Sequence, residues 1–372
     1  MGARGPGRLM LLLRQRGVGV LGSNMFGFGS NANGKLGRAA STIPADVGSV
    51  DDWQDAHSGS SFSLAIRDGR LFAAGASASP ASGLPEGAPN ATRFQQISEL
   101  TGWTYVHTFL GVSFGIRNGL LYSWGTNQDF VTGRNTNVGE SREPVQVGTL
   151  SGWTYVVAGG VGILGNAYVA AGIRNGELYT WGSNEDAGTG RGTESGFTQV
   201  PTRVGSRSDW TDVDFGVRFL GFAVLGVAGG RLFRWGRSLI FPYPLVGTPS
   251  QIGSSTNWSA VALAKGSDVR VAIQGGVLRS ITGDTTVTQR SSITGFHSVK
   301  AGGTSPAYFL ATRTNGELYS WGGNTNGQTG QGVLSGETPD PTRVGTDSDW
   351  TKARPGADPT NGSSFAFKPV GS

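Results

Sequence analysis

The chain has 372 residues, of which 63 are glycine and none is cysteine, and it carries a formal net charge of +5. The absence of cysteine excludes disulfides, thiolate nucleophiles and thiolate metal sites. Glycine well above its usual share indicates a turn-rich β protein rather than a helical one.

The first segment, residues 1–17, is a basic and apolar arm that we separate from the rest of the chain. It contains no acid and four arginines: Arg4, Arg8, Arg14 and Arg16. These residues supply most of the net charge, so the remaining chain is close to neutral and nucleic acid is not an expected partner. The apolar run at 9–13 is too short for a secretion signal or a membrane span. We expect the arm either to dock on a partner or to pair as an extra outer strand.

From residue 18 to the end, one short phrase recurs and predicts the fold. Two copies are nearly identical, NGELYTWGSN at 175–184 and NGELYSWGGN at 315–324. Weaker copies begin at residues 22, 68, 118, 229 and 275, which makes seven in all. Seven aromatic anchors, each leading into a short apolar segment, alternate with the phrase: Trp53, Trp103, Trp153, Trp210, Trp258, Phe296 and Trp350. The units are roughly 40 to 57 residues long, the size of a four-stranded propeller blade.

Within each unit the local chemistry predicts antiparallel strands. Asn118-Gly119 lies between two apolar runs, and such a pair is a strong hairpin signal because a type I′ turn needs positive φ at both central residues. The same device recurs at 68–69, 175–176 and 315–316. In the strand that follows, alternate side chains face opposite sides of the sheet. We therefore predict that the equivalent tryptophans are buried between adjacent sheets: Trp124, Trp181, Trp235 and Trp321.

The phrase G-x-L-Y-x-W-G-x-N, with an apolar strand before it and a glycine-rich turn after it, resembles the repeat of the regulator of chromosome condensation family. The resemblance covers residues 18–372, nearly the whole chain. It implies a single all-β domain, a seven-bladed β-propeller whose blades have about four antiparallel strands. Two copies depart from the phrase, at 280–282 and 74–75, where Trp-Gly is replaced.

The two ends of the chain predict how the ring closes. The last anchor, Trp350, is followed by an apolar segment at 363–368 but by no further copy of the phrase. The first copy, around residues 25–28, has no anchor before it. We therefore predict that these two segments pair in one sheet, so that the last blade is shared between the N-terminal and C-terminal segments and no sheet edge is left open.

One series of residues is a candidate site because it is evenly spaced from the aromatic anchors. The positions four residues after an anchor include His57, His107, Asp214, Lys300 and Arg354, whereas the positions just before them are all apolar. Alternation therefore places the polar series on the side of the innermost strands that lines the central channel. Since the series mixes charges without a nucleophile and base in pairs, we interpret it as solvated channel lining.

Catalytic residues, cofactors and metal ions are not expected. The Asn- and Gly-rich turns at 184–188 and 324–330 lack the alternating acids of a calcium loop, and their composition is explained by positive φ angles. The sequence contains no phosphate loop, nucleophile elbow or zinc-binding helix signature.

A partner contact is expected where some units are longer than others. The extra residues fall at 158–171, 215–228 and 302–312, and two of these stretches are rich in apolar side chains. If the extra length emerges as loop, it forms a patch on neighbouring blades. The predicted contact residues are Ile163, Leu164, Tyr168, Phe219 and Phe222. The alternative is that these side chains lengthen the inner strands and stay in the core.

Two functions of different kinds are consistent with this chain, and both have other proteins as partners and need no membrane span. The first is a non-enzymatic structural or adhesive propeller of a virion (phage capsid or tail) or of a bacterial or other extracellular surface. The alternative, which the resemblance implies, is a soluble, cytoplasmic protein–protein interaction module of the exchange-factor or enzyme-inhibitor type. An enzyme with a site at the channel mouth ranks third.

Overall fold

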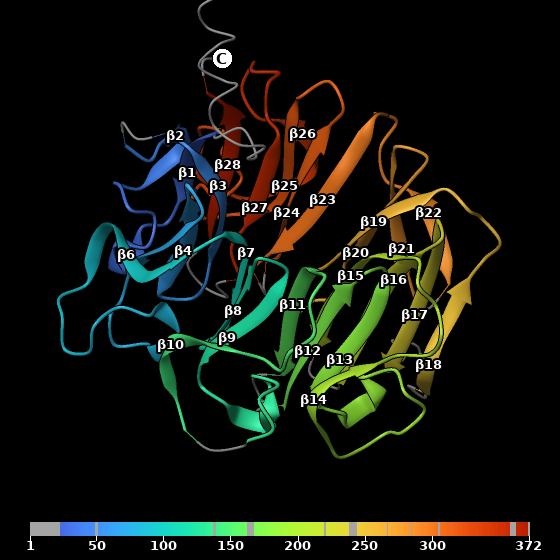
Figure 1. Cartoon of the computed structure of the whole chain (residues 1–372). Helices are drawn as coiled ribbons and strands as arrows, with labels where there is room; N and C mark the ends of the chain where they lie inside the picture. The colour runs from blue at the N-terminus through green and yellow to red at the C-terminus, as the bar shows by residue number, and fades with distance from the viewer. Residues whose placement is uncertain are drawn as a thin grey trace, which may run out of the picture.

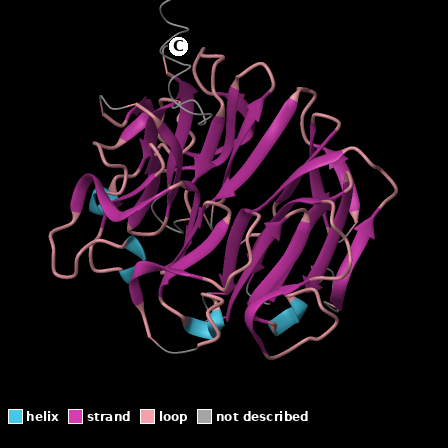
Figure 2. Ribbon diagram, in the orientation of Figure 1, coloured by secondary structure: helices cyan, strands magenta, loops and turns pink. Residues whose placement is uncertain are grey.

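The computed structural model of the chain describes residues 23–48, 51–136, 139–161, 167–218, 221–237, 244–265, 267–283, 285–303, 306–357 and 362–370. These residues form an all-β propeller, in which antiparallel sheets stand side by side around a central axis (Figures 1 and 2). The only helices among them are four short 3-10 turns: η1 (Ala32–Gly34), η2 (Pro80–Ser82), η3 (Gln128–Phe130) and η4 (Glu185–Ala187).

Five sheets have four strands each, and every one of them starts at an aromatic anchor near the axis. The first contains β7 (Trp103–Phe109), β8 (Val112–Arg117), β9 (Leu120–Gly125) and β10 (Ser141–Gln146). The second contains β11 (Trp153–Val161), β12 (Ala167–Arg174), β13 (Glu177–Ser183) and β14 (Phe197–Arg203). The third contains β15 (Trp210–Arg218), β16 (Gly221–Ala228), β17 (Arg231–Arg237) and β18 (Leu245–Ile252). The fourth contains β19 (Trp258–Leu263), β20 (Arg270–Gln274), β21 (Val277–Thr282) and β22 (Thr286–Gln289). The fifth contains β23 (Phe296–Gly302), β24 (Tyr308–Arg313), β25 (Leu318–Asn324) and β26 (Ser335–Arg343).

The remaining strands form one eight-stranded sheet that joins the two ends of the chain. Its strands are β27 (Lys352–Pro355), β28 (Ser363–Pro369), β1 (Ser23–Gly29), β2 (Ser41–Asp46), β3 (Trp53–Ser58), β4 (Phe62–Arg67), β5 (Arg70–Gly75) and β6 (Ala91–Thr101). β1 meets β3 at a single residue pair, Ser23 with Trp53. The sheet therefore consists of two groups of four strands joined at one point, and the total of seven blades stays a prediction.

The predicted pairing of the chain ends is confirmed. β1 and β28 are antiparallel over their whole length, with Met25 opposite Phe367 and Phe28 opposite Ser364. The side chains of Met25, Phe28 and Phe367 are all buried. β28 lies between β27 and β1 and is hydrogen-bonded to both. The C-terminal strand therefore leaves no open edge where the two ends of the chain meet.

Three of the four predicted type I′ turns and the buried tryptophans are also confirmed, whereas Asn315 lacks the positive φ that this turn type requires. Asn118 and Gly119 have φ of 49° and 73°, as a type I′ turn requires, and the turn at 175–176 has the same form. Trp124, Trp181, Trp235 and Trp321 are at most 2% exposed. Two of these indoles tie neighbouring sheets together, since Trp181 Nε1 donates to the Val131 carbonyl at 2.6 Å and Trp235 Nε1 donates to the Gly188 carbonyl at 3.0 Å.

The loops that follow the phrase are organised by its final asparagine. Asn184 is 2% exposed, and its Oδ1 accepts the Thr189 N–H at 3.2 Å while its Nδ2 donates to Thr193 Oγ1 at 2.6 Å. Asn127 and Asn324 accept the N–H five residues later in the same way. The Asn-rich turns thus use their side-chain amides to hold the loop itself.

Candidate functional site

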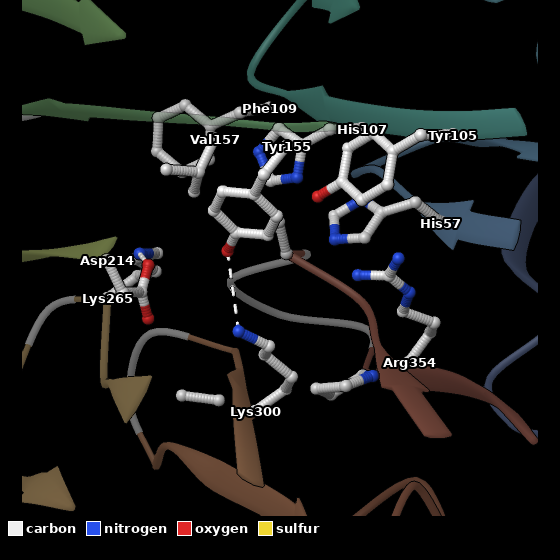
Figure 3. Close-up of a pocket in the computed structure, with 13 residues that line it drawn as sticks. His57, Tyr105, His107, Phe109, Tyr155, Val157, Asp214, Lys265, Lys300 and Arg354 are labelled. Carbon is white, nitrogen blue, oxygen red and sulfur yellow. Dashed lines mark hydrogen bonds and ion pairs between the residues drawn. The ribbon is translucent and has the colours of Figure 1, made fainter. Parts of the chain in front are cut away.

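The innermost strands of the propeller meet around one axis. Each of them contacts the next, and the series β3, β7, β11, β15, β19, β23 and β27 returns to β3. Strands at this position have a free backbone edge, whose N–H groups need hydrogen-bond partners. Side chains at every second position of these strands lie between neighbouring strands, and Figure 3 draws 13 residues that line the central cavity and labels ten of them.

Several polar residues on the inner strands satisfy the open edge of the next strand. Asp55 Oδ2 accepts the Val106 N–H at 3.2 Å, one strand further round the ring. Four other side chains make the same contact: His57 Nδ1 with the Thr108 N–H at 3.3 Å, His107 Nε2 with the Ala158 N–H at 3.1 Å, Asp212 Oδ2 with the Val261 N–H at 3.1 Å, and Asp214 Oδ2 with the Leu263 N–H at 2.9 Å. These residues therefore join adjacent blades near the axis.

The three buried carboxylates are each paired with a cation. Asp55, which is fully buried, accepts from Arg354 Nε at 3.0 Å and from Lys352 Nζ at 3.2 Å. Burial alone raises the pKa of Asp55, but Arg354 and Lys352 outweigh it and hold the pKa below its ordinary value. The other carboxylates pair in the same way: Lys300 Nζ lies 2.9 Å from Asp212 Oδ1, and Lys265 Nζ lies 2.6 Å from Asp214 Oδ1.

His57 and His107 are neutral and pack against each other. Their ring centroids are 4.4 Å apart. Burial lowers the pKa of His57 to about 3, and burial together with His57 lowers the pKa of His107 well below its ordinary value. In each ring the unprotonated nitrogen already accepts a backbone N–H, so its lone pair is not free to act as a general base.

Two tyrosines complete the wall of the cavity. Tyr105 and Tyr155 lie with ring centroids 5.5 Å apart, and burial raises the pKa of both hydroxyls. Tyr105 donates to the Val156 carbonyl at 2.9 Å. Lys300 Nζ donates to the Tyr155 hydroxyl at 3.4 Å, the contact drawn as a dashed line in Figure 3. The Arg354 Cζ atom lies 4.9 Å from the centroid of the Tyr105 ring. The cations are therefore held by aromatic faces as well as by carboxylates.

The structure brings all five predicted channel residues together around one cavity of about 40 Å³. Other residues that line it were not in the predicted set, including Tyr105, Tyr155 and Lys265. Tyr105 and Tyr155 lie two residues after their anchors, so the same spacing argument applied at this offset would have found them. Lys265 follows the end of β19 and no spacing marks it. A cavity of this size has room for one or a few waters, whereas sites for small molecules are roughly ten times larger.

The predicted partner-binding residues are not brought together as an exposed patch. Phe222 is fully buried, so its prediction as a contact residue is wrong. The extra residues of this unit lengthen the hairpin of β15 and β16, where Phe222 is opposite Val217 and packs in the core cluster. Tyr168 is half-buried, and its N–H donates to Asp129 Oδ2 at 3.0 Å. The other three, Ile163, Leu164 and Phe219, lie outside the described residues.

The described part of the chain contains neither a metal-binding cluster nor a membrane-spanning helix. No group of three or more His, Asp or Glu residues within it is placed to hold a metal ion. No helix in the same residues is long and apolar enough to cross a membrane.

Solved structures share the fold of this chain. Human WBSCR16 superposes with a TM-score of 0.74 at 18% identity, over 94% of this chain and 100% of that protein. Prp20p from Saccharomyces cerevisiae, in a structure described with its binding properties to Gsp1p and histones, gives a TM-score of 0.66 at 15% identity, over 94% and 92%. Yeast RCC1 (Prp20) bound by Kap60 gives 0.72 at 16% identity, over 94% and 90%. No protein-family model and no curated protein matches the sequence. These likenesses concern the fold.

Proposed function

We propose that the chain is a non-enzymatic propeller of seven regulator-of-chromosome-condensation-type blades that binds other proteins through its rim. The blade count is supported by the eight-stranded sheet, whose two groups of four share only the pair Ser23 and Trp53. The non-enzymatic role is supported by the central cavity, where acids, bases and cations are paired with one another or with backbone groups and where about 40 Å³ is open.

The observation that carries the protein-binding role is a gathered set of exposed apolar side chains. Ile43, Val333 and Leu334 are 54%, 56% and 65% exposed. Ile43 lies beside Gly332, the residue that precedes Val333 and Leu334, because the Gly332 N–H donates to the Thr42 carbonyl at 2.8 Å and a Cβ at Gly332 would lie 3.3 Å from the Ile43 side chain. We call these three residues the rim patch. Isolated exposed apolar residues need no explanation, whereas contiguous ones mark contact surfaces.

A photo-crosslinker tests this proposal. The full chain, with benzoylphenylalanine in place of Leu334, is expressed in its source cells and irradiated. We expect one or a few discrete cross-linked proteins, which disappear when Ile43 and Val333 are both replaced by serine. The matched control places the same group at Val287, which is 36% exposed on β22, and is expected to give no such product. Identical products at the two positions would refute a role for the rim patch.

The exchange-factor form of this function is the second candidate, and the likeness to Prp20p favours testing it. Prp20p is described with its binding to Gsp1p and histones, and this likeness leads us to prefer the cytoplasmic alternative to a virion or surface location. Nucleotide release from Gsp1p is measured with the purified chain, and Prp20p serves as the positive control. Faster release would support this form of the function. Unchanged release leaves protein binding of another kind, such as enzyme inhibition.

A further inference from the structure

A second surface, distinct from the rim patch, has the features of a peptide groove. It lies between β10 and β14, the outermost strands of two neighbouring sheets, and encloses about 510 Å³. Its exposed apolar lining residues are Val145, Leu150 and Val200, which are 39%, 40% and 43% exposed. The groove therefore has apolar side chains on both sides, and it lies beside two outermost strands, where an extended chain can lie.

One guanidinium, Arg134, lines this apolar groove. Within the described residues no hydrogen bond or ion pair involves it, and its Nε is buried without a partner. Burial lowers the pKa of Arg134. A partly desolvated cation of this kind is unfavourable until an anion pairs with it.

The equivalent residues elsewhere in the chain show that this is unusual. Arg38, Arg134, Arg191 and Gln331 each stand seven residues after the asparagine that organises the loop. Arg191 NH1 donates to the Thr180 carbonyl at 3.1 Å, and Gln331 Nε2 donates to the Ser320 carbonyl at 3.1 Å. Arg38 NH1 donates to the Asp46 carbonyl at 2.9 Å. Three of the four side chains thus bond within their own sheet, and Arg134 alone among them is left to the groove.

We propose that this groove binds an extended segment of a partner protein in which an Asp or Glu stands next to an aliphatic residue. Arg134 pairs with the carboxylate, for which its planar guanidinium offers a two-point contact. The aliphatic side chain packs against Leu150 and Val200. This inference rests on the proposed function and names the chemistry of one partner segment.

Peptide selection tests the proposal directly. The full chain is used to select from a phage-displayed library of random peptides, with counter-selection on an Arg134→Gln, Val200→Ser double variant. Glutamine is chosen because it is the residue at the equivalent position 331. We expect the enriched peptides to carry Asp or Glu beside Leu, Ile or Val. Enrichment of peptides without an acid, or no preference for the wild type over the variant, would overturn the proposal.

A selected peptide is then synthesised to locate the contact. Replacing its acid with the corresponding amide, or replacing Arg134 with Gln, is expected to weaken binding by at least about tenfold. In methyl NMR spectra the peptide is expected to shift the signals of Val145, Leu150 and Val200. Shifts confined to other methyl groups would show that the groove is not the site.

Two matched variants separate a local effect from a general one. Arg191→Gln removes a guanidinium from the same loop position of the next sheet, and Val287→Ser removes an exposed apolar side chain from another outer strand. Both are expected to bind the peptide as the wild type does, and thermal melts check that all variants are folded. If the benzoylphenylalanine at position 334 still cross-links a partner while Arg134→Gln leaves peptide binding unchanged, the groove proposal fails and the protein-binding role stands. Loss of both results would remove the proposed function itself.

Discussion

At the residue scale, the buried polar side chains near the axis join neighbouring blades rather than perform chemistry. Asp55 and His57 each accept a backbone N–H from the next inner strand, and Asp55 also holds Arg354. Such contacts are strong only while every group has its partner, because an unpaired charge in this environment carries a large desolvation penalty. Two consequences can be measured.

The first is acid sensitivity caused by His57 and His107. Burial lowers the pKa of His57 to about 3 and of His107 well below its ordinary value, so the unfolded chain takes up two protons near pH 6.5 that the folded chain does not. The free energy of unfolding is therefore highest above pH 6.5 and decreases as the pH falls toward 3, by about 1.4 kcal/mol per pH unit for each proton. Urea unfolding between pH 4 and 7 measures the slope. A His57→Gln, His107→Gln variant should have a shallower slope, with the exposed His297→Gln as control; an unchanged slope would contradict this explanation.

The second is the cost of leaving Arg354 without its carboxylate. Asp55→Asn keeps the size of the side chain but removes the charge that pairs with Arg354 and Lys352. We expect the free energy of unfolding to fall by about 3–5 kcal/mol, the range for breaking a buried ion pair. Asp209→Asn is the control, because Asp209 and its partner Arg207 are 45% and 37% exposed, and it should cost less than about 1 kcal/mol. Equal stability of the two variants would show that the Asp55 pairs contribute nothing.

At the element scale, the sequence predicted what is determined locally. A hairpin such as the one at 118–119 depends on adjacent residues, so Asn-Gly suffices to identify it. The contacts of the central cavity join residues about 50 positions apart, as from Asp55 to Val106. The spacing argument identified the positions four residues after each anchor, but it missed the positions two residues after an anchor, such as Asp55. Phe222 was misjudged because length alone does not distinguish a longer hairpin from a projecting loop. The Arg134 groove depends on which of four equivalent side chains lacks a partner, and the sequence does not contain that information.

The loops after the phrase provide an element-scale prediction. Asn184→Ala removes the amide that bonds to Thr189 and Thr193, and we expect a loss of about 1–3 kcal/mol because buried donors are left unpaired. Hydrogen exchange should become faster in residues 185–196, where these bonds hold the loop. Asn90→Ala, at an exposed position, is the control and should leave both quantities unchanged. Unaltered protection of the loop in Asn184→Ala would mean that its backbone holds the conformation alone.

At the scale of the whole molecule, the ring depends on its last strand. A chain ending at Gly362 lacks β28, which lies between β27 and β1 and buries Phe365 and Phe367. We expect it to lose the single cooperative transition in calorimetry and to aggregate, since β1 then exposes a strand edge. The control ends at Pro369, keeps β28 and should melt like the full chain. A cooperative melt of the shorter chain at the same temperature would show that closure does not stabilise the ring.

The pairing of β1 with β28 also sets the order of events during biosynthesis. The strand that contains Phe26 is made long before its partner residue Ala366. At translation rates of about 5–20 residues per second, β1 waits tens of seconds for its neighbour. Until then one edge of β1 has no partner and is open to pairing with other chains. A premature stop before or within β28 therefore removes the strand for which β1 waits.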